Sequence, residues 1–200
     1  MKIIERFHSK LIFDRRVRVL NGHLRTLIPT GTHVLDVGCG NGLLAHLIVK
    51  NHSGVEIEGV DVLVRDKTYI TVEPFDGSHI PHSDASFDFV MFVDVLHHTE
   101  DPMVLLREAR RVARTAIVIK DHLREGLFAA RTLRLMDWVG NAHYGVALPY
   151  NYWSRRQWST AFEALNLKPI VWQEDLGLYA WPASSVFERS LHFITRLDLT

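Results

Sequence analysis

The chain has 200 residues, of which 47% are hydrophobic and 23% are charged, which is enough for one domain with a substantial core. Its 23 basic residues balance its 23 acidic residues, which excludes a whole-molecule field that attracts nucleic acid. A single cysteine excludes an intramolecular disulfide, and the first residues lack the apolar core of a signal peptide. No window is apolar for the length that a membrane span needs. We therefore expect a cytoplasmic protein without stable membrane insertion and without a nucleic-acid partner.

The first part of the chain predicts a long helix followed by alternating strands and helices. Apolar residues recur at helical spacing over residues 2–28, where basic residues outnumber acidic ones, and Pro29 and Gly31 end this pattern. Two further helical patterns, at residues 41–51 and 103–113, separate short apolar runs at residues 33–38, 54–62, 69–76, 87–95 and 115–121. Strands that alternate with helices predict a parallel sheet with helices on both faces.

The second part predicts a helix at residues 123–139, an aromatic loop at residues 140–153 and a helix at residues 155–166. Ser154 and Gln157 form a capping box that starts the last of these helices. Two late apolar runs, at residues 167–174 and 187–197, are typical of closing strands. The whole pattern predicts a Rossmann-like, doubly wound α/β domain with a mostly parallel, seven-stranded sheet.

The stretch VLDVGCGNG, residues 34–42, ends a strand in alternating glycines and then opens a helix. Such a turn exposes backbone N–H groups to a ligand at the carboxyl edge of the sheet. A Cβ would hold the ligand away, so Gly38, Gly40 and Gly42 are candidate binding residues. Read from Gly40, the spacing also permits a dinucleotide fingerprint, and Asp61 suits the ribose of either kind of ligand. The glycine spacing alone leaves both ligands open.

Asp36 distinguishes the two ligands. A carboxylate in a buried strand is costly unless it is paired, and it would repel a pyrophosphate but attract an ammonium or sulfonium group. With this acid, the chain resembles the class I S-adenosylmethionine-dependent methyltransferases. VLDVGCGNG is similar to their first motif, GVDV to their second, and residues 76–102 to their later motifs. The resemblance covers roughly residues 30–121.

The resemblance implies S-adenosylmethionine as the cofactor and a set of residues that bind it. Asp36 would help to hold the methionine ammonium, Asp61 the ribose and Asp76 the adenine amine. The full set is Asp36, Gly38, Gly40, Gly42, Asp61, Asp76, Gly77, Val93 and Asp94. We accordingly interpret the chain as one domain, with a helical cap over the cofactor cleft at residues 1–28, a cofactor-binding core at residues 30–121 and an acceptor-side half at residues 122–200. For the basic, amphipathic first segment, contact with an anionic lipid surface is the alternative.

The chain departs from the family between Asp61 and Tyr69. The seven residues between them are too few for the usual crossover helix between parallel strands. We expect an irregular loop there, with the helix lost or the third strand displaced.

Methyl transfer from a sulfonium is an in-line displacement, in which the protein mainly positions the acceptor and removes its proton. Candidate bases follow the strands at the active edge of the sheet, namely His97, His98, Lys120, Asp121 and His122. From these we select His122 and His98 as the catalytic residues.

The sequence shows no metal-binding pattern. Cys39 has no cysteine partner and no HExxH motif occurs, so we expect no metal site. The loop at residues 140–153 is rich in tyrosine, and such side chains suit an aromatic or amphipathic acceptor. We expect Tyr144 and Tyr150 to bind the acceptor, with packing of the next helix as the alternative role.

These features favour S-adenosylmethionine-dependent methyl transfer to a small-molecule or lipid-like acceptor. Two alternatives remain, an NAD-dependent oxidoreductase on the same kind of fold and a protein that binds the adenosyl cofactor without catalysis. The first would bind a dinucleotide and ignore S-adenosylmethionine, and the second would bind the cofactor and consume none.

Overall fold

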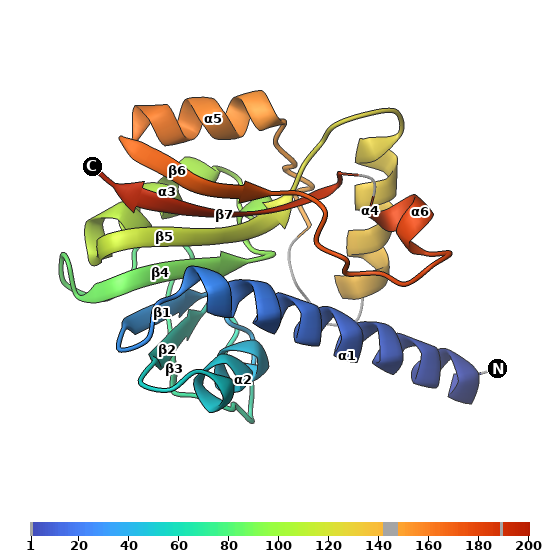
Figure 1. Cartoon of the computed structure of the whole chain (residues 1–200), viewed down its shortest axis with the longest axis horizontal. Coiled ribbons are helices and arrows are strands. Elements are labelled where there is room, and N and C mark those ends of the chain that lie inside the picture. The colour runs from blue at the N-terminus through green and yellow to red at the C-terminus, as the bar shows by residue number, and fades with distance from the viewer. Residues whose placement is uncertain (1, 142–147, 189) are drawn as a thin grey trace.

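A seven-stranded sheet lies at the centre of the molecule (Figure 1). The computed structural model describes residues 2–141, 148–188 and 190–200. Within them the strand order is β3-β2-β1-β4-β5-β7-β6, and only β7 runs antiparallel to its neighbours β5 and β6. The strands are β1 (His33–Val37), β2 (Glu56–Asp61), β3 (Val72–Pro74), β4 (Phe87–Val93), β5 (Ala113–His122), β6 (Leu167–Gln173) and β7 (His192–Leu199). The expected Rossmann-like, mostly parallel sheet is confirmed.

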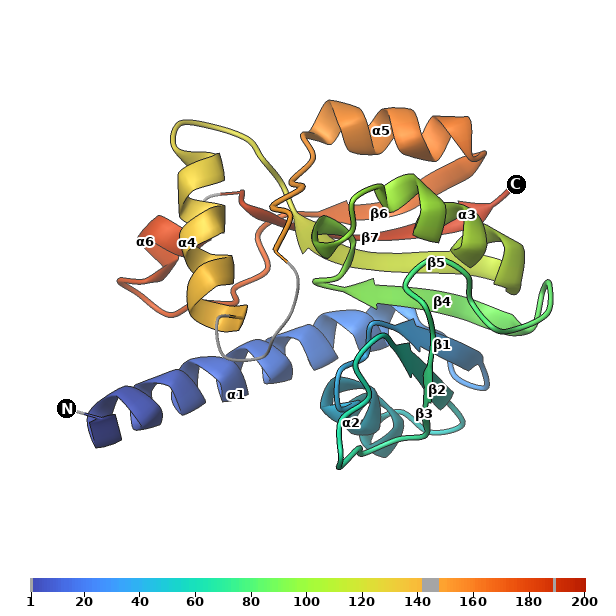
Figure 2. The same ribbon diagram turned by 180° about the vertical axis from the view of Figure 1, so that it is seen from behind.

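Helices cover both faces of this sheet (Figure 2), because alternate residues of each central strand point to opposite sides. In β1, Val34 packs in a core cluster that includes Leu24, whereas Leu35 packs in a second cluster that includes Leu106 and Phe162. The helices are α1 (Lys2–Leu27), α2 (Leu43–Asn51), the 3₁₀ helix η1 (Leu96–His98), α3 (Pro102–Val112), α4 (Ala129–Asn141), α5 (Arg155–Ala164) and α6 (Ser184–Phe187). The first cluster lies under α1 and α2, and the second under α3 and α5.

Local signals set where α3 and α5 begin. Asp101 caps α3 by accepting the N–H of Met103 at 2.9 Å, and proline occupies the first helical position. Ser154 and Gln157 form both bonds of the capping box at the start of α5, as expected.

The segment between β2 and β3 contains no helix, as its length predicted. Residues 62–71 form an irregular loop, and β3 is reduced to Val72–Pro74. Gly59 still pairs with Val72, so the short third strand keeps its place beside β2.

Two boundaries differ most from the expected ones. The last strand begins at His192 rather than at residue 187, and α4 begins at Ala129 rather than at residue 123. The carboxylate of Glu188 accepts the N–H groups of Leu178 and Tyr179, both at 3.0 Å, which keeps this part of the chain out of the sheet. At the other boundary, β5 pairs with β7 as far as His122, so α4 cannot begin at that point.

α1 lies along one face of the sheet and extends beyond it toward α4 (Figure 1). Leu20, Leu24 and Leu27 bury its C-terminal half against the sheet and α2, and the side chain of Arg16 reaches the end of β4. Among the described helices, none is both long and apolar enough to cross a membrane.

Candidate active site

The glycine turn joins β1 to α2 at the carboxyl edge of the sheet. Gly38, Gly40 and Gly42 have φ angles of 74°, 60° and 73°, in the left-handed region that favours glycine. A Cβ added to Gly38 would lie 2.6 Å from the side chain of Val95. A Cβ added to Gly40 would have no described heavy atom within 4 Å apart from those of its chain neighbours. The turn is packed at Gly38 and open at Gly40, where a ligand can approach the backbone.

Asp61 ends β2 and is buried beside this turn. One of its carboxylate oxygens accepts the N–H of Gly40 at 2.7 Å, and the other accepts the N–H of Leu63 at 2.8 Å. Each oxygen has a second lone pair, so the carboxylate can hold the turn and also accept hydroxyl donors such as those of a ribose.

Asp36 lies in β1, before the turn, and is buried. Burial, together with the nearby charge of Asp61, raises the pKa of its carboxyl group to about 8. A cationic ligand beside it would favour the ionised form. The open glycine turn and these two acids therefore fit a cofactor with an ammonium group and a ribose.

Asp76 and Gly77 form a turn after β3. The Asp76 carboxylate accepts the backbone N–H groups of Ser78 and His79, both at 2.7 Å, and these bonds lower its pKa to about 2. Gly77 has a φ of 83°, and a Cβ there would lie 3.1 Å from Val62. This arrangement matches a turn-forming aspartate and places it next to the segment that follows Asp61.

Val93 is the last residue of β4, and Asp94 follows it as the centre of an ion network. The Asp94 carboxylate pairs with the fully buried Lys120, with Arg16 of α1 at 3.1 Å, and lies 3.7 Å from Nε2 of His122. Burial raises the pKa of Asp94, but Lys120 and Arg16 outweigh burial and hold it well below its usual range. The network ties α1 to the ends of β4 and β5.

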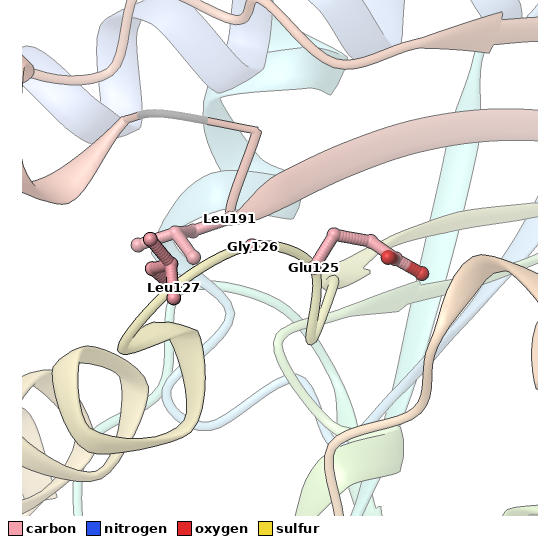
Figure 3. A pocket seen from close by; sticks show the side chains of 4 residues that line it. All are labelled: Glu125, Gly126, Leu127 and Leu191. Carbon is pink, nitrogen blue, oxygen red and sulfur yellow. The ribbon is translucent and has the colours of Figure 1, made fainter.

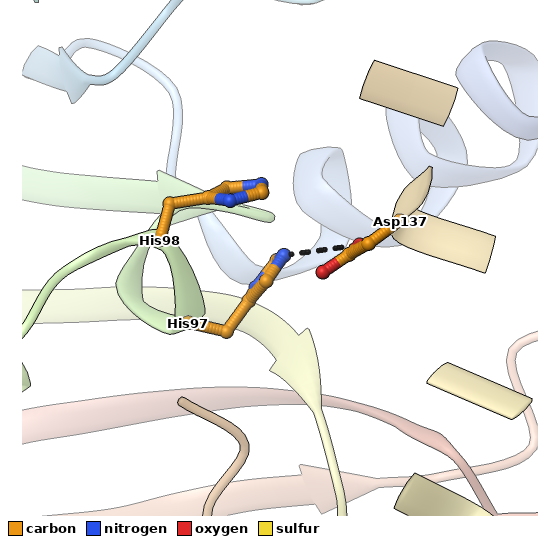
Figure 4. Close-up of side chains that lie close together, drawn as sticks. All are labelled: His97, His98 and Asp137. Atoms are coloured by element: carbon orange, nitrogen blue, oxygen red, sulfur yellow. Dashed lines mark ion pairs between the residues drawn. The ribbon is translucent and has the colours of Figure 1, made fainter. Parts of the chain in front are cut away.

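A histidine cluster lies beyond Asp94, built from His97, His98, Asp121, His122 and Asp137. Nδ1 of His97 lies 2.6 Å from Oδ1 of Asp121, and Nε2 lies 3.4 Å from Oδ1 of Asp137 on α4 (Figure 4). The ring of His97 is 4.0 Å from that of His98 and 4.5 Å from that of His122, measured between centroids. Asp121 also accepts the backbone N–H groups of Leu96 at 3.0 Å and His122 at 2.7 Å, which fixes its position.

The three histidines differ in charge. Burial lowers the pKa of His97, but the carboxylates of Asp121 and Asp137 outweigh burial and raise it to about 10. Burial and the neighbouring charge of His97 lower the pKa of His98, and they hold that of His122 well below its usual range. At neutral pH, His97 is therefore charged, while His98 and His122 are neutral.

Several members of this site were missing from the residues selected from sequence. Asp137 lies on the inner face of α4, and its carboxylate accepts a hydrogen bond from the hydroxyl of the buried Tyr152. Arg16 comes from α1, and Nδ1 of His192 lies 3.3 Å from Nζ of Lys120. The one signal for Asp137 was an acid four residues after Leu133, on the face of α4 that is otherwise apolar.

Of the two tyrosines predicted to bind the acceptor, the structure describes one. Tyr144 lies outside the described residues. Tyr150 is half-buried, and the guanidinium of Arg134 lies 5.5 Å from its ring. Among the described tyrosines of this loop, Tyr152 reaches the histidine cluster, with its ring stacked 5.6 Å from that of His97.

A small pocket of about 220 Å³ lies before α4 and is lined by Glu125, Gly126, Leu127 and Leu191 (Figure 3). Ligand pockets usually enclose about 300–1,000 Å³. None of the residues predicted to bind cofactor or acceptor lines it, so we do not assign it to the site.

The fold is a Rossmann-like domain, and the glycine turn with its two acids fits an adenosyl cofactor. The sequence profile of a methyltransferase-domain family matches residues 6–171. The chain belongs to this family, the class I S-adenosylmethionine-dependent methyltransferases. This membership decides between the two ligands that the glycine spacing left open, in favour of S-adenosylmethionine.

Individual relatives agree with the family. The chain is 31% identical over 110 residues to the 27-O-demethylrifamycin SV methyltransferase of Amycolatopsis mediterranei (strain S699), a match that covers 48% of this chain and 40% of that protein. It is 30% identical over 97 residues to the ubiquinone biosynthesis O-methyltransferase of Histophilus somni (strain 2336), which covers 40% of each. The chain thus matches about two fifths of the length of these relatives.

Solved structures show the same fold. An S-adenosylmethionine-dependent methyltransferase of Thermotoga maritima superposes with a TM-score of 0.68 at 16% identity, covering 99% of this chain and 96% of that one.

Proposed function

We propose that the protein transfers the methyl group of S-adenosylmethionine to a hydroxyl group of a small-molecule acceptor. The observation that carries this proposal is the position of Val95. Its side chain contacts the position of Gly38 in the glycine turn, and the next residues in the chain form η1 with His97 and His98. The cofactor turn and the histidine cluster therefore meet at one edge of the sheet.

In this proposal, residues 30–121 hold the cofactor, and residues 122–200 complete the acceptor side within one domain. Asp36 binds the ammonium group, Asp61 the ribose hydroxyls, and the turn at Asp76 and Gly77 the adenine. Val93 and Asp94 border the cofactor at the end of β4. When bound, S-adenosylmethionine supplies an electrophilic methyl group, so the protein's task is to align the acceptor oxygen and remove its proton.

His122 is placed to take that proton. Its Nε2 lies 3.7 Å from Oδ1 of Asp94 and 3.9 Å from Oδ1 of Asp137, between the cofactor strand and α4. It is neutral in this environment, which a general base requires. His98 is half-buried on η1 and borders the acceptor, as do Tyr144 and Tyr150 in our proposal.

An oxygen acceptor is favoured by the relatives, whose names include a 27-O-demethylrifamycin SV methyltransferase and an O-methyltransferase of ubiquinone biosynthesis. The histidine cluster supports the same choice, because a hydroxyl nucleophile needs a base and His122 of this cluster is the proposed base.

A structure with bound S-adenosylhomocysteine tests the placement without knowledge of the acceptor. We expect its sulfur atom to face Val95 and the histidine cluster. A sulfur atom that faces away from η1 would show that the cluster is not the acceptor site.

Kinetics test the base. With the best acceptor from a panel of phenols and alcohols, His122→Gln is expected to lower kcat by about 10²–10⁴-fold with unchanged S-adenosylhomocysteine affinity. The exposed His79, changed to Gln, is the control. Unchanged kcat in His122→Gln would assign the base elsewhere, and cofactor binding without formation of S-adenosylhomocysteine would favour the non-catalytic alternative.

A further inference from the structure

We propose that the histidine cluster binds one divalent transition-metal ion of the zinc class through His97, His98 and Asp137. The sequence pattern predicted no metal, because these three residues have no recognisable metal-binding spacing. Their placement together is a property of the tertiary structure, in which α4 carries Asp137 over η1 (Figure 4). The catalytic role of this ion rests on the proposed function, whereas its binding does not.

The geometry of the donors fits such an ion. One nitrogen from each histidine and one carboxylate oxygen of Asp137 lie within 4.8 Å of one another. Two donors on a tetrahedral zinc ion, each about 2.0–2.1 Å from the metal, are separated by roughly 3.3 Å. Nε2 of His97 and Oδ1 of Asp137 are 3.4 Å apart, so an ion can bridge them without moving either side chain. A small rotation of His98, which is only half-buried, completes the set.

His97 supplies the second, independent observation. Its side chain is 2% exposed, and its Nε2 makes no hydrogen bond within the described part of the chain, although it forms an ion pair with Oδ1 of Asp137 at 3.4 Å. A buried nitrogen in that state is costly, and a metal ion is a partner that satisfies it. The nitrogen faces the Asp137 oxygen, which is the direction in which the ion would lie.

The surrounding groups orient the donors as they do in known metal sites. Asp121 accepts a hydrogen bond from the N–H at Nδ1 of His97. Nε2 is therefore the ring nitrogen that can bind a metal, once it has lost its own proton. Tyr152 donates to Oδ2 of Asp137, so Oδ1 is the oxygen that remains for a metal. His97 and Asp137 therefore each have a hydrogen-bond partner that fixes the orientation of the side chain.

The set of donors indicates the class of ion and its use. Two imidazoles and one carboxylate suit Zn²⁺ and similar ions, and three protein ligands leave a fourth position open. The acceptor hydroxyl would fill that position through its oxygen. Its O–H bond would break with both electrons left on oxygen, and the proton would pass to Nε2 of His122. The positive charge of the ion would stabilise the oxygen anion, which then attacks the methyl carbon as the bond from that carbon to sulfur breaks and S-adenosylhomocysteine leaves.

Binding of Co²⁺ to the full-length protein after EDTA treatment tests the site directly, since Co²⁺ in a tetrahedral site absorbs visible light. We expect one equivalent to bind, with release by added Zn²⁺. His98→Ala and Asp137→Asn should each weaken Co²⁺ binding by at least about 100-fold. The matched control is His79→Ala, which removes an exposed histidine outside the cluster and should bind Co²⁺ like the parent.

S-adenosylhomocysteine stabilisation of each variant, measured by melting temperature, shows that the fold and the cofactor turn are intact. Absence of the visible bands in the parent, or equal Co²⁺ affinity in His98→Ala and the parent, would overturn the metal site and leave the proposed methyl transfer standing. Full turnover of the EDTA-treated enzyme would overturn the role of the ion in catalysis. Loss of turnover in His122→Gln with unchanged Co²⁺ binding would support both proposals separately.

Discussion

At the scale of single residues, the buried acids beside the glycine turn have different surroundings. Asp61 accepts two backbone N–H groups, at 2.7 and 2.8 Å. Asp36 is buried against it, and its carboxyl group keeps a proton up to about pH 8. A cationic group bound beside Asp36 would therefore lower the pKa of its carboxyl group and favour the ionised form.

Asp36 makes stability depend on pH in a stated direction. In the unfolded chain its carboxyl ionises near pH 4, whereas in the folded protein it does so near pH 8. The unfolded state thus binds fewer protons between these values, and the free energy of unfolding falls as pH rises through the window. Asp36→Asn should raise this free energy at pH 8 by up to about 5 kcal/mol and change it little near pH 4.

Urea unfolding of the parent and the variant at both pH values measures this effect. The control is Asp66→Asn, an exposed acid in the loop after β2. A similar difference at both pH values would mean that Asp36 is already ionised in the folded protein.

At the scale of elements, α1 packs on the sheet and reaches the end of β4 through Arg16, next to the proposed cofactor and acceptor sites. Its C-terminal half is buried through Leu20, Leu24 and Leu27. Deletion of the whole helix would therefore remove core as well as any cap. Arg16 offers a sharper test, because it reaches Asp94 at 3.1 Å from a half-buried position without contributing to the apolar core.

Arg16→Ala should leave the fold intact and loosen α1 over the end of β4. The pair is partly exposed, with side-chain exposures of 31% and 23%, and Asp94 keeps Lys120 as a partner. We expect a loss of about 1 kcal/mol in unfolding free energy and a several-fold weaker affinity for S-adenosylhomocysteine, measured by calorimetry. Arg25→Ala, on an exposed position of the same helix, is the control. Equal affinities in both variants would show that α1 is not a cap over the cofactor.

At the scale of the whole molecule, the cofactor should stabilise the fold because its proposed contacts come from β1, β2, β4 and the connecting loops. A ligand that binds only the folded state adds about 2.7 kcal/mol at 100 times its dissociation constant. For a chain of 200 residues this corresponds to a rise of roughly 5–10 °C in Tm.

We therefore expect S-adenosylhomocysteine to raise Tm by this amount and NAD to leave it unchanged, since the acid at residue 36 disfavours a pyrophosphate. Gly40→Val should abolish the rise, because valine would be strained at a φ of 60° and would fill the open space at the turn. A rise with NAD and none with S-adenosylhomocysteine would contradict the assignment of the cofactor.

The sequence by itself determined the parts that depend on local chemistry. The run from Val34 to Gly42 predicts a strand, a glycine turn and a helix, because β1, the turn and α2 each follow from residues that are neighbours in the chain. Asp61 was found in the same way, since an acid at the end of the next parallel strand must come to the same edge of the sheet. The missing crossover helix followed from the length of one connection.

The tertiary structure alone decided which residues surround the proposed acceptor site. Arg16, Asp137 and Tyr152 come from α1, α4 and the following loop, and they meet the ends of β4 and β5 only because these elements pack over them. The first residues of α4 and β7 also depended on long-range contacts, through the pairing of β5 with β7 and the bonds of Glu188. Periodicity and turn chemistry act over a few residues, whereas the direction in which a distant helix presents its acid depends on the packing of the whole core.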